Sequence, residues 1–207
     1  KWKKLEIVDN IKNADWFIFM DIINIDISNL DKSKIIIVQR EPYINADYKG
    51  IKNILNYNTY IHLFTCIYHI GINYQNIFKL NIDNQRNKLC SAVVSKFIQK
   101  KPFEAYKSYL KRISFIKTIC KIDKFNIDVF GYNWKKDELG NKYKGVLGGF
   151  NIGTAEHIEN LIPNTTKVDG LIDYKYSIAI ENCKKNNYIS EKFTDCILCG
   201  TIPIYYG

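Results

Sequence analysis

The sequence is poor in the residues that build metal centres. Its 207 residues include 3 histidines, 1 methionine and 4 prolines. None of the six cysteines falls in the paired spacing that zinc sites use; they are Cys66, Cys90, Cys120, Cys183, Cys196 and Cys199. Cys196 and Cys199 lie one turn apart on a predicted helix, so we interpret them as small buried apolar residues rather than redox or zinc ligands.

Long hydrophobic runs are also absent. No apolar stretch approaches the roughly 18 to 20 residues that a membrane-spanning helix needs. No signal-peptide pattern opens the chain either. From the sequence as it stands we expect a soluble chain without a transmembrane segment.

Positive charge is in excess but dispersed. Lysine and arginine number 30 against 21 acidic residues, which gives a net charge of +9. Such a balance suits nucleic acid, anionic membranes or phosphorylated small molecules. The lysine doublets alternate with apolar runs instead of forming one stripe, so they favour solvated faces over a nucleic-acid interface. With 46% hydrophobic and 25% charged residues, the chain is globular and long enough for one large or two small domains.

The first half has the pattern of a doubly wound α/β domain. Compact apolar runs at residues 5–8, 16–20 and 35–38 are rich in β-branched and aromatic residues, which is typical of parallel strands. Residues 81–88 are the most polar segment and therefore the predicted linker. We predict an N-terminal domain over residues 1–84 and a C-terminal domain over residues 85–207.

The second half continues the α/β pattern. Residues 89–94 and 126–131 are predicted strands, and residues 103–119 have helical spacing, with Phe103, Tyr106, Leu110 and Ile113 on one face. Residues 132–172 are predicted to be loop and short helix. Within them, residues 145–153 are rich in glycine but lack the Lys-Ser/Thr of a phosphate-binding P-loop, so a flexible loop is expected.

The last stretch, from Tyr174 to Gly207, is predicted to be a βαβ unit. Residues 174–182 and 201–206 are apolar enough for strands buried on both faces. Ser190 stands where a helix N-cap belongs, and Gly200 where a left-handed helix end is needed. In such units ligands bind at the carboxyl edge of the sheet, beside the helix N-terminus.

Charged and polar residues gather at that predicted edge. Lys192 adds a full charge to the positive end of the helix, and unpaired N–H groups of the first turn are expected to face the same way, so a phosphate would fit. Glu181 and Glu191 are better acceptors for sugar or ribose hydroxyls. The mixture suggests a nucleotide that carries a sugar. A capped helix whose first turn is simply solvated explains the same residues equally well.

Three blocks of this stretch resemble a known family. They are YKYSIAIEN from Tyr174, YISEK from Tyr188 and GTIPIYYG from Gly200, and together they are similar to the donor-site signature of the α1,3/4-fucosyltransferases, glycosyltransferase family 10. The resemblance implies a GT-B fold, in which two Rossmann-like domains face each other across a cleft. It also implies GDP-fucose as donor, inversion at the anomeric carbon and an oligosaccharide or glycoprotein acceptor. Related enzymes continue past the equivalent of Gly207, so a truncated donor domain is expected.

The resemblance also assigns roles to residues. Lys192 would counter the charge that develops on GDP, while Glu181, Asn182, Tyr188 and Glu191 would bind ribose, phosphate or fucose hydroxyls. Glu41, at the end of the third predicted strand, would take the proton from the acceptor hydroxyl. No Asp-x-Asp motif occurs, so no cofactor and no obligatory metal are expected.

One family feature is missing. The arginine that holds the donor pyrophosphate is replaced at the aligned place by Lys101, which supplies charge but not a bidentate fork. Arg112 is a weaker substitute. The departure keeps two alternatives open: a non-catalytic nucleotide- or glycan-binding relative, and a GT-B enzyme that uses another nucleotide sugar.

Two further expectations concern the acceptor and the compartment. Aromatic residues over 46–78 could stack on a sugar or fill a core; they include Tyr57, Tyr60, His62, Tyr68 and His69. Related enzymes lie in the Golgi lumen in animals and are soluble or peripheral in bacteria, so the compartment stays open.

Overall fold

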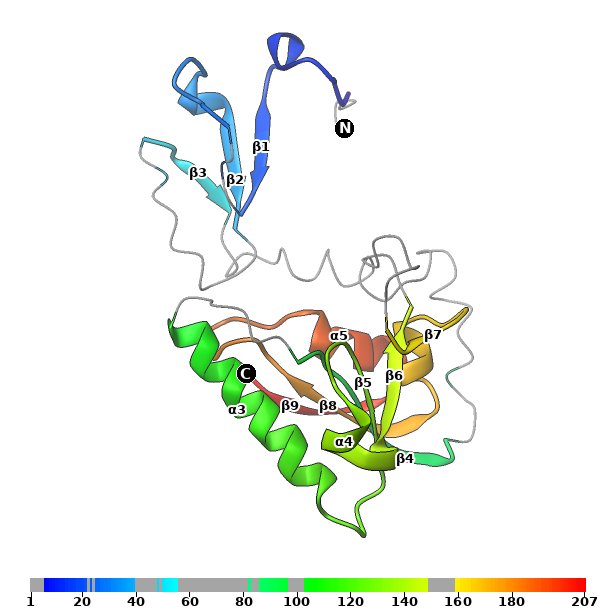
Figure 1. The fold of residues 1–207 in the computed structure, drawn as a ribbon. Coiled ribbons are helices and arrows are strands. Elements are labelled where there is room, and N and C mark those ends of the chain that lie inside the picture. The colour runs from blue at the N-terminus through cyan, green and yellow to red at the C-terminus, as the bar shows by residue number, and fades with distance from the viewer. Residues whose placement is uncertain are drawn as a thin grey trace. The chain divides into compact units, whose positions relative to one another are not determined.

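Figure 1 shows the computed structural model of the chain, which describes residues 6–21, 23, 25–39, 48, 50–55, 82, 86–96, 103–148 and 159–207. The chain divides into two compact units, Lys1–Ile61 and His62–Gly207. Each unit contains a parallel sheet, so the predicted mixed α/β class with parallel sheets is confirmed. The domain boundary predicted after residue 84 and the two-domain cleft stay predictions.

The N-terminal unit contains a three-stranded parallel sheet in the order β1-β2-β3. Its strands are β1 (Phe17–Met20), β2 (Ile35–Val38) and β3 (Asn53–Leu55), and short 3-10 helices precede β1 and β2 at η1 (Ile11–Asn13) and η2 (Lys32–Lys34). The central strand supplies the core, because Ile35 and Ile37 are fully buried.

The strand predicted at residues 5–8 is wrong for the residues that the structure describes. Residues 6–8 form no strand, and Ile7 is 96% exposed. The run is short and is flanked by lysines on one side and by Asp9 and Asn10 on the other, so it has too little apolar surface to bury. Strand β3 was not predicted; it pairs with β2 through the register Ile36↔Asn53.

The C-terminal unit is built on a six-stranded sheet in the order β7-β6-β5-β4-β8-β9, with every pairing parallel. The strands are β4 (Lys88–Val93), β5 (Ile127–Phe130), β6 (Tyr143–Leu147), β7 (Leu161–Ile162), β8 (Tyr174–Ile180) and β9 (Ile202–Tyr206). From β4 the chain moves outward through β5, β6 and β7, and it then returns to place β8 on the other side of β4. The order therefore reverses between β4 and β8, and such a switch point is where open α/β sheets bind ligands.

Helix α3 (Phe103–Cys120) covers one face of this sheet (Figure 1). Ile113 and Ile116 pack in a core cluster with Ala92 of β4 and Val129 of β5. The predicted helix is confirmed; of the residues whose spacing indicated it, Ile113 is buried, whereas Leu110 is 43% exposed. The buried stripe instead runs through Tyr109, Arg112, Ile113 and Ile116.

Helix α5 (Glu191–Leu198) covers the opposite face, because Ile178 of β8 packs with α3 while its neighbour Ala179 packs with Cys196 of α5. The predicted helix limits are confirmed. The Ser190 hydroxyl accepts from the Lys192 N–H, and Gly200 has a φ of 66°. Cys196 and Cys199 are buried and form no disulfide, as the sequence predicted.

The segment before β8 contains more structure than expected. Residues 132–172 were predicted to be loop and short helix, but they include β6 and β7 besides α4 (Lys136–Leu139), η3 (Gly140–Lys142) and η5 (Lys167–Gly170). Gly145, which marked a flexible loop, lies inside β6 with a φ of 121°, where an added Cβ would be 2.6 Å from the Asn160 carbonyl oxygen. The sequence shows the glycine but not the neighbour that requires it; residues 149–153 of the predicted loop lie outside the described part.

Strand β9 is the edge of the sheet. The prediction that this strand is buried on both faces is therefore wrong. Ile202, Ile204 and Tyr206 are each about half exposed, at 57%, 46% and 54%. They share a face with Ile178 through the register Ile178↔Ile204, so they border the space beside α3. A cavity of about 400 Å³ lies there, between α3 and the strands β8 and β9.

Candidate functional site

The candidate site lies at the carboxyl ends of β4 and β8, where the strand order of the C-terminal unit reverses. Charged side chains from α3, α5, η5 and the end of β8 gather at this edge. Three are cations and three are carboxylates: Arg112, Lys167, Lys192, Glu181, Glu191 and Asp195. The sequence predicted half of this set, Lys192, Glu181 and Glu191; it named Arg112 only as a weaker substitute for the missing arginine and did not assign Lys167 and Asp195.

Glu181 is buried, at 3% exposure, and both of its oxygens are engaged within the chain. Oε1 accepts from the Ser190 N–H at 2.7 Å and from the Tyr205 hydroxyl at 3.3 Å. Oε2 accepts from the Ser190 hydroxyl at 2.5 Å and lies 3.6 Å from the Lys192 ammonium. Glu181 thus joins the end of β8 to the start of α5. Its predicted contact with sugar or ribose hydroxyls stays a prediction.

Lys192 is held at the first turn of α5 by carboxylates. Its ammonium lies 3.0 Å from Glu191 Oε1 and 3.0 Å from the Ser190 hydroxyl, and 17% of its side chain is exposed. Burial alone would lower the pKa of Lys192, but the charges of Glu191 and Glu181 outweigh burial and raise the pKa to about 12. The side chain is therefore a cation throughout the physiological pH range.

The N–H groups at the start of α5 are less available than the sequence suggested. The Lys192 N–H donates to the Ser190 hydroxyl at 3.4 Å, and the Phe193 N–H donates to the Ser190 carbonyl at 3.2 Å. The expectation of unpaired N–H groups is therefore wrong at these two positions, because the N-cap residue itself satisfies them. What the helix end contributes is its partial positive charge.

Tyr188 and Asn182 have different surroundings. Tyr188 is 2% exposed, so its ring packs inside the protein, and its carbonyl accepts from the Tyr205 hydroxyl at 3.2 Å. Asn182 is partly exposed at the end of β8. The ligand-binding roles of both residues stay predictions; exposure favours Asn182 over Tyr188 as a contact residue.

Arg112 is the residue that sequence reasoning undervalued. Although it lies in the middle of α3, its guanidinium reaches the site: Nη1 donates to Asn182 Oδ1 at 2.7 Å, and Nη2 donates to the Ser95 carbonyl at 3.3 Å. The group stacks on the Tyr109 ring, with 4.5 Å from Cζ to the ring centroid, and Arg112 is only 4% exposed. Burial lowers its pKa, against the opposing influence of Tyr109. Arg112 lies on the same stripe of α3 as the apolar residues Ile113 and Ile116, and a cation in such a stripe is the sequence signal that could have identified it.

Lys167 and Asp195 form the second unpredicted part of the site. The Lys167 ammonium of η5 pairs with Asp195 Oδ2 of α5, and Asp195 is fully buried. Among the described residues no group donates to Asp195 Oδ1. Burial raises the pKa of Asp195 to about 6, although the Lys167 charge opposes the rise. Glu191 and Lys192 are near enough to act on the pKa of Lys167.

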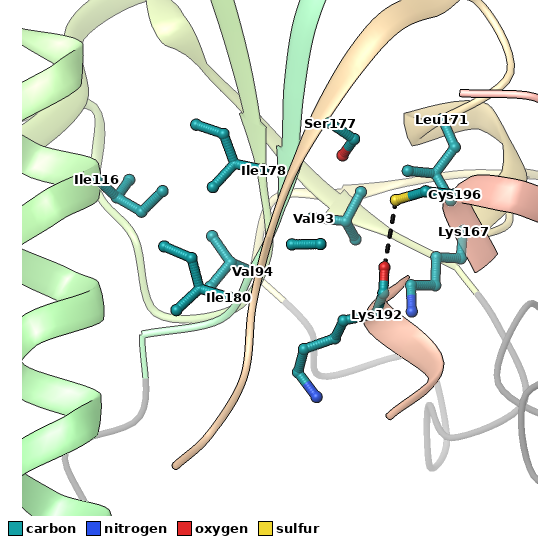
Figure 2. A pocket seen from close by; sticks show the side chains of 11 residues that line it. Val93, Val94, Ile116, Lys167, Leu171, Ser177, Ile178, Ile180, Lys192 and Cys196 are labelled. Atoms are coloured by element: carbon teal, nitrogen blue, oxygen red, sulfur yellow. Dashed lines mark hydrogen bonds between the residues drawn. The ribbon is translucent and has the colours of Figure 1, made fainter. Parts of the chain in front are cut away.

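Figure 2 shows a small cavity lined by side chains of α3, β4, β8, η5 and α5, among them Lys167 and Lys192. Apolar side chains such as Val93 and Ile178 line the rest, and the Cys196 thiol donates to the Lys192 carbonyl at 3.2 Å. The cavity measures about 10 Å³, which is room for one water molecule at most. A larger ligand would therefore meet these ammonium groups from the open edge of the sheet.

The remaining predicted residues lie outside the described part of the chain. These are Glu41, Lys101 and the aromatic residues Tyr57, Tyr60, His62, Tyr68 and His69. Their roles stay predictions. Where the structure is described, no cluster of His, Cys, Asp or Glu could hold a metal ion, and no helix is long and apolar enough to cross a membrane.

Fold and site together define a parallel α/β protein whose cations gather at a topological switch point. The family model of the C-terminal part of glycosyltransferase family 10 (fucosyltransferase) matches residues 83–207, which is more than half of the chain. The chain belongs to this family, as its C-terminal signature predicted.

Two curated relatives match shorter stretches. A putative fucosyltransferase-like protein of Arabidopsis thaliana is 39% identical over 41 residues, and the alpha-(1,3)-fucosyltransferase B of Drosophila melanogaster is 51% identical over 37 residues. These stretches cover 20% and 18% of this chain and 8% of each relative. The matches therefore support the family without describing a whole related enzyme.

Proposed function

We propose that this chain is an inverting fucosyltransferase that moves fucose from GDP-fucose to a glycan hydroxyl. The acceptor would be an oligosaccharide or glycoprotein, as in α1,3/4-fucosyltransferases. In the proposed GT-B arrangement, the C-terminal unit holds the nucleotide sugar and the N-terminal unit holds the acceptor. Family membership supports the reaction class; the donor, the stereochemistry and the linkage are parts of the proposal.

The observation that carries the proposal is the position of Lys192. It is a cation at the amino end of α5, beside the end of β8, where the strand order reverses. Open α/β sheets bind nucleotides at such points, and a helix N-terminus favours phosphate. Because its pKa is raised to about 12, Lys192 keeps its charge while a diphosphate binds and leaves.

The site suggests how the leaving diphosphate would be stabilised. Negative charge grows on GDP as the bond to fucose breaks, and Lys192 together with the positive end of α5 would counter it. Glu191 Oε1 lies 3.0 Å from the ammonium, so it would give up part of this contact to phosphate. We propose that these groups act without an obligatory metal ion. Glu41 would deprotonate the acceptor hydroxyl as it attacks the anomeric carbon.

Two competing functions are separated by ligand choice and by turnover. Thermal shift with GDP, GDP-fucose, GDP-mannose and UDP-sugars tests the donor; we expect stabilisation by GDP and GDP-fucose, and a preference for a uridine donor would contradict the fucosyl assignment. Transfer or donor hydrolysis, measured as release of GDP, tests catalysis. If GDP binds but neither reaction occurs even in a longer chain, the protein is a non-catalytic nucleotide-binding relative, which the missing arginine at Lys101 would explain.

A further inference from the structure

The side chain of Arg112 connects the ends of the two strands that flank the switch point. It donates to the Ser95 carbonyl, just after β4, and to Asn182 Oδ1, just after β8. The Tyr109 ring stacks on one face of the guanidinium and fixes its plane. Nε is buried and has no partner among the described residues, so the two outer nitrogens make the contacts that hold Arg112 in place.

This contact determines which way the Asn182 amide faces. A guanidinium can only donate hydrogen bonds, so the atom of Asn182 that lies 2.7 Å from Nη1 must be the amide oxygen. The NH2 group consequently points away from Arg112. Within the described part of the chain no acceptor is placed against this NH2 group, and Asn182 is partly exposed. Arg112 thus holds the amide with its donor end turned away from the guanidinium.

We infer that Arg112 is a positioning residue that fixes the Asn182 amide so that its NH2 group donates to a phosphate oxygen of a nucleoside diphosphate. The inference rests on the proposed function. Phosphate oxygens only accept hydrogen bonds, whereas sugar hydroxyls both donate and accept, so an amide with a fixed donor end selects the former. Asn182 follows the end of β8 and Lys192 lies in the first turn of α5, so in this inference one anion at the carboxyl edge of the sheet meets both groups.

The arrangement assigns Arg112 an indirect role. Arg112 is 4% exposed and its guanidinium is already engaged on two sides, so the contact with ligand is made by Asn182. A purely structural brace would use the same contacts, but it would affect stability and leave the affinity of the folded protein for nucleotide unchanged. The two roles are therefore separated by measuring the stability and the affinity for nucleotide of the same variants.

The test is a double-mutant cycle on GDP binding, measured by calorimetry on the whole chain with Arg112→Lys, Asn182→Ala and the double variant. We expect Asn182→Ala to weaken GDP binding about 10-fold, since a hydrogen bond to a charged group is lost. Arg112→Lys should weaken it about 5-fold, since lysine cannot form the fork that holds both strand ends. The double variant should bind no more weakly than Asn182→Ala, because Arg112 acts through the amide.

Three results would overturn the inference. Additive losses would mean that Arg112 contacts phosphate directly, and unchanged affinity with a lowered melting temperature would mean a brace alone. Asn182→Asp gives a third check. It keeps an oxygen that accepts from Arg112, so the contact that holds Arg112 in place is preserved. It should bind GDP at least 10-fold more weakly than the wild type, because an anionic oxygen replaces the donor; wild-type affinity would refute the donor role.

The control is Lys107→Met, which removes an exposed cation from the same helix outside the site and should leave GDP affinity within 2-fold. The wild-type titration keeps the two proposals distinguishable. If the wild type binds no GDP, the proposed function and this inference both fail. If it binds GDP through Lys192 but is indifferent to Asn182, only the inference fails.

Discussion

Helices α3 and α5 bring cations to the same edge of the sheet in two different ways. Lys192 sits in the first turn of α5, where the helix end itself favours anions. Arg112 sits in the middle of α3, on the buried face of the helix, and reaches the strand ends with its long side chain. The first arrangement follows from local sequence, since a capping serine precedes the lysine. The second depends on how far α3 lies from the end of β8, which is a property of the packed unit.

The difference predicts which property of the protein a substitution in each helix affects. Helix α5 is short and depends on ion pairs at Lys192 and Asp195, whereas α3 is long and depends on apolar packing at Ile113 and Ile116. Substitutions on α5 should therefore act on charge and ligand, and substitutions on α3 should act first on stability.

The largest effect is expected from the apolar face of α3. Ile116 is fully buried, so Ile116→Ala should lower the free energy of unfolding by about 4 kcal/mol through lost burial and a residual cavity. Leu110→Ala on the same helix is the matched control, with about 1 kcal/mol expected, because Leu110 is 43% exposed. Urea unfolding measures both. Equal losses would contradict the packing of α3 through Ile116.

The next effect concerns the buried pair of α5. Lys167→Met removes the cation beside Asp195 and should cost about 3 kcal/mol at neutral pH, since a fully buried carboxylate loses its partner. The pKa of Asp195, about 6 in the wild type, should then rise further. A carboxyl group whose pKa is higher in the folded than in the unfolded state stabilises folding at low pH and loses this contribution as pH rises through the folded pKa.

The loss caused by Lys167→Met should consequently shrink between pH 7 and pH 5, and thermal unfolding across that range measures it. Adding Asp195→Asn should abolish the pH dependence. A loss that is constant with pH would show that Asp195 does not titrate in the folded protein.

The third effect concerns the ligand. Lys192→Ala should weaken GDP binding roughly 50-fold, because a charge-assisted contact to phosphate is lost and two carboxylates are left uncompensated. Lys192→Arg, which keeps the charge, should stay within about 5-fold of the wild type. Calorimetric titration with GDP measures both variants; unchanged affinity in Lys192→Ala would contradict the proposed function.

The smallest effect concerns the ion pairs that join α4 to α3 and to the segment after β4. Glu138 lies 2.6 Å from both Lys96 and Lys117, and although burial opposes it, these cations lower the pKa of Glu138 to about 2. Such a group stabilises folding above its unfolded pKa, and the contribution is lost as pH falls through the folded pKa. Glu138→Gln should cost about 1.5 kcal/mol at pH 7 and progressively less from about pH 4.5 to 2. Acid unfolding of both proteins measures it; parallel curves would refute the assignment.

Local patterns were sufficient for the βαβ unit at the end of the chain. Ser190 as N-cap, Gly200 as left-handed terminator and the apolar run of β8 were all confirmed, because each depends on neighbours close in sequence. Errors arose where a distant element decides the outcome. Gly145 resembles a loop residue until β7 is placed against it, and Ile202 resembles a buried strand residue until β9 is placed at the edge of the sheet.

The same division applies to the candidate site. The sequence alone determined the family, the strand and helix that form the site, and the cation at the start of α5. Only the tertiary structure showed that Arg112 donates to the Asn182 amide oxygen and that Lys167 pairs with Asp195. It also showed that Glu181 is buried and accepts from Ser190. Capping and helix charge act over one turn of chain and can be recognised in the sequence. Contacts between elements far apart in the chain depend on how the helices pack across the sheet, which no local pattern contains.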